Sequence, residues 1–148
     1  MRGFESEVIG ALTSELQVGG GIALQYGKVI DSPDGYEGNR FANTPRVQVG
    51  MFASYRWTKF GLARLETRLG VIYVDERYAN SANTYKLPDY TRVDIGASYQ
   101  LTKKAVITVS VENLFDETYY TGAQDSPQSD QIMVGNRRLI QAGFRMEF

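Results

Sequence analysis

Side chains suited to holding a ligand are concentrated in three polar segments of the sequence. The first contains Tyr36, Arg40 and Phe41, the second contains Tyr85, and the third, residues 124–128, contains two glutamines. Aromatic rings and a guanidinium group suit an anionic ligand, because the guanidinium can donate charge-assisted hydrogen bonds to it and lie over an aromatic ring of the ligand in a cation–π contact. Tyr36, Arg40, Phe41 and Tyr85 are therefore the candidate ligand-binding residues.

Other kinds of chemistry are excluded by composition. The 148 residues include no Cys and no His, so thiol nucleophiles, His-dependent catalysis and His- or Cys-ligated metals are absent. Asp31, Asp34 and Glu37 carry oxygen ligands but lack an EF-hand spacing, so we expect a solvated acidic loop, no metal site and no cofactor. With 16 basic and 17 acidic residues, the chain also lacks the basic excess of a nucleic-acid-binding protein. An enzyme is the weakest of the function classes.

The elements that must position these side chains are β-strands, because apolar and polar residues alternate along most of the chain. The clearest run has Val93, Ile95, Ala97 and Tyr99 on one face and Asp94 on the other. We predict about seven strands, each of about 9–11 residues or more, the length that crosses a bilayer. They are expected at residues 4–12, 18–26, 47–57, 63–73, 92–101, 105–112 and 140–148.

The connections between these strands alternate in length. Residues 13–15, 58–59 and 102–104 are short polar turns, whereas residues 31–44, 80–89 and 121–135 are long and rich in Asp, Asn, Ser, Gly and Pro. An all-β, antiparallel up-and-down meander with all its long loops at one end is typical of outer-membrane β-barrels. Aromatic pairs near strand ends, at 55–57, 73–78 and 119–120, are expected in interfacial girdles.

The charged residues of the strands indicate which face is wet. At the bilayer midplane an Arg or Lys facing lipid would cost about 2–4 kcal/mol, so the charged face is expected to line an aqueous interior. The charged residues of this face are Arg56, Arg64, Glu66, Arg68, Arg92, Asp94, Glu112, Arg145 and Glu147.

Two alternative interpretations of the sequence stay open. One is a small stand-alone barrel serving as an anchor, adhesin or pore, and the other is a soluble β-sandwich or lipocalin-like binding protein.

Several motifs resemble one known family. The segment VENLFDETYY ends at Tyr120, and LPDYTRVDIGASYQL ends at Leu101. Together with Arg2-Gly3-Phe4-Glu5, Asn43-Thr44-Pro45-Arg46, Glu76-Arg77-Tyr78 and the terminal Phe148, they are similar in order to the closing strands of TonB-dependent outer-membrane receptors, which transport siderophores and other iron complexes.

The resemblance implies a function and a set of partners. It implies TonB-dependent uptake of a ferric siderophore across the outer membrane of a Gram-negative bacterium, with capture by the extracellular loops. It also implies that the barrel assembly machinery reads a C-terminal signal, and that outer-membrane lipid surrounds the strands. The alternating residues of that signal are Phe148, Met146, Phe144, Ala142 and Ile140.

The chain also departs from the family pattern. Such receptors have barrels of about 22 strands, filled by an N-terminal plug that contacts the TonB complex. We expect residues 1–148 to be the C-terminal barrel segment of a receptor, without the plug, as a fragment, a truncated gene or an engineered piece.

Overall fold

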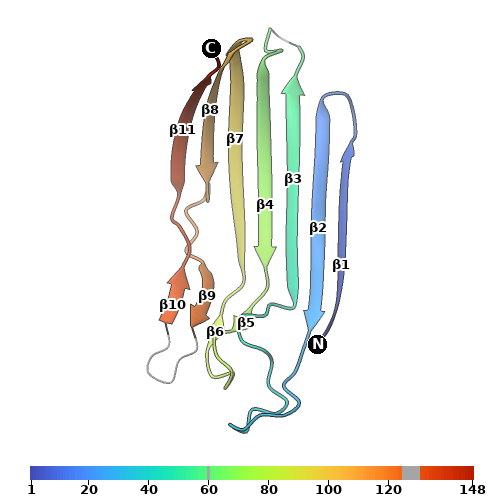
Figure 1. The fold of residues 1–148 in the computed structure, drawn as a ribbon, viewed down its shortest axis with the longest axis vertical. Helices are drawn as coiled ribbons and strands as arrows, with labels where there is room; N and C mark the ends of the chain where they lie inside the picture. Colours follow the sequence, from blue (N-terminus) through green and yellow to red (C-terminus); the bar gives the residue numbers. More distant parts are fainter. Residues whose placement is uncertain (60, 125–130) are drawn as a thin grey trace.

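The computed structural model describes residues 1–59, 61–124 and 131–148, and the regular elements in these ranges are all β-strands. Seven of them form one antiparallel sheet in the order β1-β2-β3-β4-β7-β8-β11 (Figure 1). This confirms the predicted meander. The strands of this sheet are β1 Arg2–Ala11, β2 Leu16–Tyr26, β3 Val47–Trp57, β4 Leu65–Val74, β7 Tyr90–Thr102, β8 Ala105–Glu112 and β11 Leu139–Met146.

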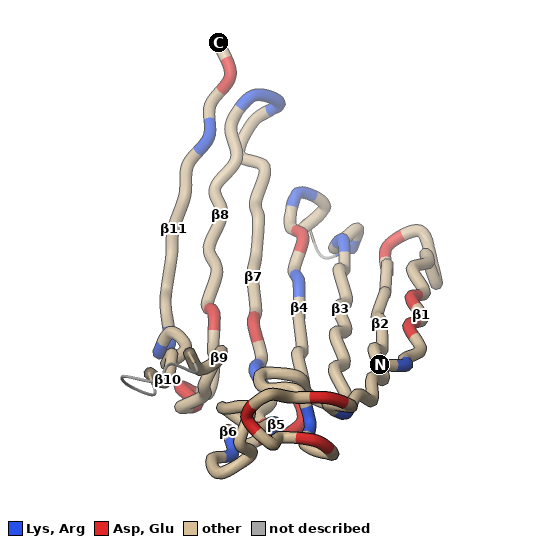
Figure 2. Tube along the Cα trace, turned by 60° about the horizontal axis from the view of Figure 1, so that its bottom comes forward, with Lys and Arg blue, Asp and Glu red and all other residues tan. Residues whose placement is uncertain are grey.

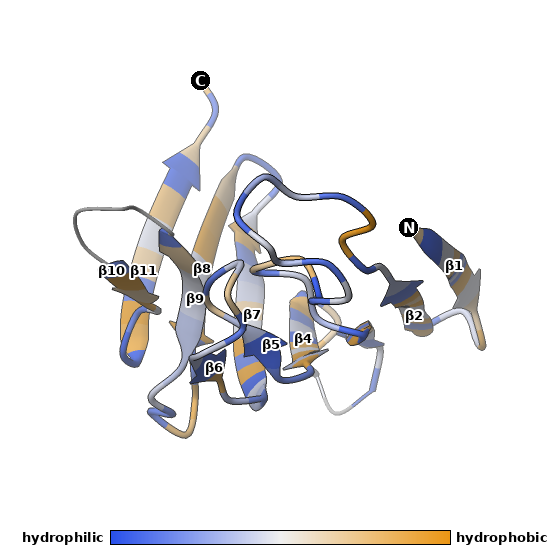
Figure 3. Cartoon of the chain, turned by 90° about the horizontal axis from the view of Figure 1, so that it is seen from below, coloured by the Kyte–Doolittle hydropathy of each residue, from blue (hydrophilic) through white to orange (hydrophobic). Residues whose placement is uncertain are grey.

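The strand register places the apolar residues of neighbouring strands opposite one another. Met51 of β3 faces Gly20 of β2 and Val71 of β4, and Val71 in turn faces Val93 of β7. We call this side of the sheet the apolar face. The opposite, polar face carries cross-strand pairs such as Arg56 with Glu66. The hydropathy bands along the strands in Figure 3 follow this alternation.

Some predicted strand bounds need correction. β8 has the predicted bounds but only eight residues, and β11 covers Leu139–Met146 in place of the predicted 140–148. Backbone hydrogen bonds continue past both: the Leu114 amide donates to the Val93 carbonyl, and the Glu147 amide to Lys104. β4 begins at Leu65 and not at the predicted residue 63, because the Leu65 amide donates to the Leu62 carbonyl in a turn.

The long connections contain short strands that the sequence pattern did not reveal. β5 pairs with β6, and β9 with β10, where single loops were expected. Of the loop residues 124–128, only Gln124 is among the described residues. The additional strands are β5 Arg77–Tyr78, β6 Lys86–Leu87, β9 Tyr120–Gln124 and β10 Gln131–Val134.

The buried apolar residues lie mainly in these connections, and in the seven-stranded sheet they are Val74 of β4 and Ala105 of β8. Figure 3 shows the sheet as an arc with β1 and β11 at its two ends. Both of these strands are exposed along their whole length. The buried apolar cluster of Ala79, Leu87 and Ala123, with Tyr120 packed against it, lies in the long connections. No helix of the described residues is long and apolar enough to cross a membrane.

Candidate functional site: the loop platform

The three long connections interlock at one end of the sheet. We call their described residues, within 27–46, 75–89 and 113–138, the loop platform. Asn43 joins all three connections. Its side-chain amide donates to the Ala123 carbonyl (2.7 Å) and accepts from the Ala123 amide (2.8 Å), and its backbone amide donates to the Tyr78 carbonyl (2.8 Å). One side chain thus completes a backbone-like pairing across 80 residues of sequence.

Two further side chains tie the second connection to its neighbours. Asn83 brackets the backbone of Arg40, accepting from its amide (2.8 Å) and donating to its carbonyl (2.9 Å). Arg77 donates through Nη2 to the Tyr120 carbonyl (2.6 Å). Arg77 is only 3% exposed, and this burial lowers the pKa of its guanidinium, which still remains protonated at neutral pH. These ties make the platform one packed unit.

Four non-glycine residues of the platform adopt the left-handed backbone region. Asn43, Asn83, Asn113 and Asp116 have φ of 55°, 58°, 53° and 56°. Asn and Asp tolerate this conformation better than other side chains because their short polar groups bond nearby backbone. Each of the four also makes side-chain hydrogen bonds within the platform. The only hint of these roles in the sequence was that Asn and Asp are the residue types that favour this backbone conformation.

A cationic and aromatic cluster lies on β5 and β6. The Tyr78 ring has Arg40 Cζ and Lys86 Nζ each 5.5 Å from its centroid. Lys86 pairs with Glu76 at 2.7 Å, and this hydrogen bond raises the pKa of Lys86 and lowers that of Glu76. Two cations against one carboxylate leave the cluster with a net positive charge, which suits an anionic ligand.

The four predicted ligand-binding residues lie at different places on the platform. Arg40 belongs to the cluster. Phe41 packs its ring against Gly27, where an added Cβ would lie 2.7 Å from ring carbons. Tyr36 is half-buried and Tyr85 is 59% exposed. Their role in binding stays a prediction, whereas Tyr78, Lys86 and Glu76 are candidates that sequence reasoning did not select.

A clamp closes the base of the third connection. Asp116, just after β8, binds Arg137, just before β11, through two hydrogen bonds of 2.6 and 2.9 Å, and also accepts from the Arg138 amide (2.9 Å). Arg137 holds the pKa of the Asp116 carboxyl far below its usual range. Asn113 donates to the Asn136 carbonyl (3.0 Å) beside it. The clamp fixes where β11 starts relative to β8.

Three tyrosines of the predicted girdle pack within the loop platform. Tyr119 is buried, with its ring centroid 4.7 Å from that of Tyr90 and its hydroxyl accepting from Arg92 Nη1 (3.2 Å). Tyr120 packs on the buried cluster, and Tyr78 lies between two cations. These three rings are therefore part of the platform, and their place in an interfacial girdle stays a prediction.

The predicted assembly signal lies along the exposed edge strand. Phe144 faces Ile107 and Ala142 faces Val109, which places these alternate residues on the apolar face. Phe148 follows the end of β11 and is fully exposed. Their reading by the assembly machinery stays a prediction. In the described part of the chain, no group of three or more acidic side chains is gathered closely enough to hold a metal ion.

Comparison with known proteins gives a consistent result. Residues 1–114 match the family model described as "TonB dependent receptor-like, beta-barrel". The metal-pseudopaline receptor CntO of Pseudomonas aeruginosa is 32% identical over 120 residues, covering 80% of this chain and 17% of the receptor. The probable TonB-dependent siderophore receptor PiuA of Acinetobacter baumannii is 29% identical over 134 residues, covering 90% of this chain and 17% of its own length.

The fold also matches solved structures. The ferric yersiniabactin uptake receptor FyuA of Yersinia pestis superposes with a TM-score of 0.82 at 26% identity, over 97% of this chain and 23% of that receptor. The chain therefore spans about a fifth of the length of the relatives it matches.

Proposed function

The chain belongs to the TonB-dependent receptor β-barrel family, and from this premise we propose that it forms barrel wall and extracellular loops of a receptor for ferric siderophores. Members of this family are outer-membrane proteins of Gram-negative bacteria, which places the sheet in that membrane. Long loops of such barrels face the cell exterior and short turns face the periplasm. The loop platform accordingly faces the medium.

The cluster of Arg40, Tyr78 and Lys86 carries the proposal. It presents two cations around an aromatic ring on a platform whose three connections are fixed by buried hydrogen bonds. A rigid, positively charged surface captures an anionic iron chelate with little loss of conformational freedom. Tyr36, Phe41 and Tyr85 would add aromatic surface at other places on the platform.

The remaining steps belong to the whole receptor. Captured chelate would pass inward when the TonB complex acts on a plug in the longer protein. Lipid would surround the apolar face. The barrel assembly machinery would read the stripe from Ile140 to Phe148. The chain's family consists of transport receptors and not of enzymes.

The two alternatives drawn from the sequence are not favoured. A stand-alone anchor, adhesin or pore and a soluble β-sandwich are both less consistent with a family match over residues 1–114 and with relatives named as receptors.

The test is binding of radiolabelled iron chelates to cells that carry the complete receptor. The probes are an anionic ferric tris-catecholate and an uncharged ferric trihydroxamate. Removing both charges in the double variant Arg40→Gln/Lys86→Gln should weaken catecholate binding about tenfold. The matched control Lys103→Gln/Lys104→Gln removes two charges at the opposite end and should leave binding unchanged. Wild-type cells that bind neither chelate, or a control that weakens binding equally, would contradict the proposal.

A further inference from the structure

A hollow of about 550 Å³ lies on the polar face of the sheet, in the half of β7, β8 and β11 that is nearer the short turns (Figure 1). Hydroxyl side chains follow one another in its lining: Ser98 of β7 faces Thr108 of β8, and Ser110 lies two residues further along β8. Arg145 of β11, which faces Val106, lies at the end nearer the β7–β8 turn. The hollow is thus distinct from the loop platform, which lies at the opposite end of the strands.

Much of the hydrogen-bonding capacity around this hollow is unused. Within residues 1–59, 61–124 and 131–148, the side chains of Ser98, Ser110 and Arg145 have no hydrogen-bond or ion-pair partner. Glu147, the carboxylate nearest to Arg145 along the chain, forms no ion pair with it in these ranges. Free hydroxyl and guanidinium donors that face one hollow are complementary to the oxygen atoms of an anion.

The one carboxylate beside the hydroxyl row, in the part of the chain that the structure describes, is already neutralised. Glu66 faces Ser98 in the β4–β7 register, but Arg68 binds its carboxylate at 2.8 Å and the Ser54 hydroxyl donates to it at 3.0 Å. Arg68 and Arg145 both belong to the lining of the hollow, and none of the described residues in that lining is acidic. Arg145 therefore leaves the hollow with a net positive charge.

Glycines provide the room for a ligand. Gly96 of β7 and Gly143 of β11 are both part of the lining. A Cβ added at Gly96 would lie 3.6 Å from the Val109 carbonyl oxygen, an ordinary contact, so a larger side chain there would extend into the hollow without a backbone clash. The volume of the hollow is in the range of small-molecule sites in proteins.

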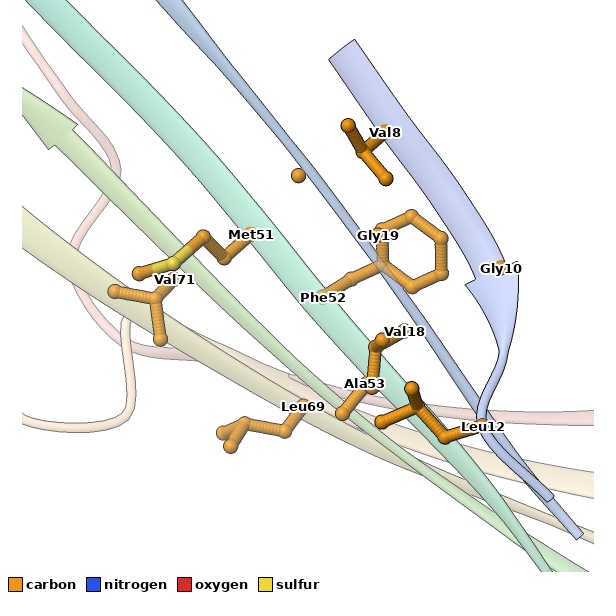
Figure 4. Close-up of a pocket in the computed structure, with 11 residues that line it drawn as sticks. Val8, Gly10, Leu12, Val18, Gly19, Met51, Phe52, Ala53, Leu69 and Val71 are labelled. Carbon is orange, nitrogen blue, oxygen red and sulfur yellow. The ribbon is translucent and has the colours of Figure 1, made fainter.

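The polar face of β1 to β4 has a different character. Ile9 and Phe52 lie in one row across the strands with Gly19 between them, and Ile72 lies in the next row opposite Gly50. The Phe52 ring lies beside Gly19 (Figure 4). We call Ile9, Phe52 and Ile72 the apolar pad. Inside a barrel, an apolar surface is stabilised when another part of the protein packs on it, whereas the hydroxyl-lined hollow is stabilised by water or a polar ligand.

We propose that the hollow is an inner anion site, which holds the captured iron chelate on its way to the periplasm. This inference rests on the proposed function for the nature of the anion. Ser98 and Ser110 donate hydrogen bonds to the chelate oxygens, and Arg145 supplies the attractive charge. The wall of β7, β8 and β11 then lines the passage, whereas the apolar pad lies against another part of the receptor.

The first test measures access and charge by thiol labelling of the complete receptor in detergent, with the unsubstituted receptor as background. The chain has no Cys, so Ser110→Cys adds a single thiol to this wall. It should react faster with a sulfonate-bearing methanethiosulfonate than with a trimethylammonium one, after normalisation to a small free thiol. Arg145→Gln should lower this preference about threefold, as expected for one charge several ångströms away in watery surroundings.

The matched position for labelling is Gly50→Cys on the apolar pad, where an added Cβ meets no heavy atom within 4 Å. This thiol should react far more slowly than that of Ser110→Cys, because another part of the receptor covers the pad. Equal rates at the two positions would contradict the proposal, since protein would then cover the hollow as well or water would reach both halves alike. A charge preference that Arg145→Gln leaves unchanged would overturn it too.

The second test compares surface binding with energised uptake of radiolabelled ferric tris-catecholate, in cells that carry the complete receptor. Arg145→Gln should keep surface binding and slow uptake about threefold. Gly96→Phe fills the hollow and should slow uptake further, and its unchanged surface binding would report correct folding. Lys103→Gln removes a charge outside the hollow and should leave both quantities unchanged. Uptake at the wild-type rate by both hollow variants would overturn the inner site.

The inner site and the proposed function can fail separately. Wild-type cells that bind no chelate at their surface contradict the proposed function, whereas the labelling of Ser110→Cys needs no chelate and tests the anion site alone.

Discussion

The sheet and the loop platform are stabilised in different ways. Strand β1 and strand β11 are exposed throughout, and the sheet is held by ladder hydrogen bonds and by register. The platform contains the buried cluster of Ala79, Leu87 and Ala123 and a set of side-chain-to-backbone hydrogen bonds. The stability of the sheet therefore depends on what surrounds its apolar face, whereas the stability of the platform depends on individual side chains.

Figure 2 shows the same contrast in charge. Basic residues gather at the β7–β8 turn, and acidic residues mark the first long connection. The middle of most strands carries little charge, as expected where the surroundings are hydrocarbon. The effect of a substitution on stability should therefore differ between the two regions. On the apolar face of the sheet it should depend on the polarity of the new side chain, and in the platform on whether the hydrogen bonds are kept.

The largest expected effect is in the platform, at Asn113. This residue is 1% exposed, has φ of 53°, and donates to the carbonyls of Glu117 (2.8 Å) and Asn136 (3.0 Å). Asn113→Ala should destabilise the protein by about 4 kcal/mol, because it adds left-handed strain and leaves buried carbonyls unpaired. The measurement is urea unfolding of the receptor in detergent micelles.

Glycine at the same position separates the two causes. Asn113→Gly keeps the backbone conformation and loses only the hydrogen bonds, so its effect should be smaller than that of Asn113→Ala. If both variants unfold at the wild-type urea concentration, the platform does not depend on this side chain.

The next effect should appear on the apolar face of the sheet. Ile95 lies near the middle of β7, opposite Leu69 and Val111. Ile95→Arg should cost about 3 kcal/mol in lipid, because a midplane guanidinium faces hydrocarbon. The matched variant Ser98→Arg lies on the polar face opposite Glu66 and should cost about 1 kcal/mol or less. Reversible folding into bilayers would measure both, and equal costs would contradict the assignment of the two faces.

The smallest effect should be the pH dependence of the clamp. The folded pKa of Asp116 is lowered from its ordinary 3.8, so the clamp contributes fully above pH 3.8 and is lost as the pH falls through the lower folded value. The stability difference between wild type and Asp116→Asn should therefore be constant at neutral pH and shrink below about pH 3.8. Thermal unfolding at a series of pH values measures this. Glu117→Gln, one residue away, should show no such change, and a pH-independent difference for Asp116→Asn would argue against the clamp.

Strand positions were predictable because alternation is a local property. The bounds 47–57 and 105–112 were predicted without error, since Val47–Trp57 and Ala105–Glu112 have uniform alternation and clear turns beside them. The short strand pairs β5–β6 and β9–β10 were not predicted, because two to five residues are too few to show an alternation of apolar and polar side chains. Arg40 was selected as a candidate by its chemistry, but its neighbours Tyr78 and Lys86 were not, because they lie in another connection.

The sequence by itself determined the seven-stranded meander, the apolar and polar faces, and the resemblance to a receptor family. Each follows from residue type at fixed local spacing, because side chains alternate between the faces of a strand. Only the tertiary structure decided how the long connections interlock. Asn43 with Ala123 and Arg77 with Tyr120 are 80 and 43 residues apart, and hydrogen bonds over such separations form only after the strands have brought the loops together.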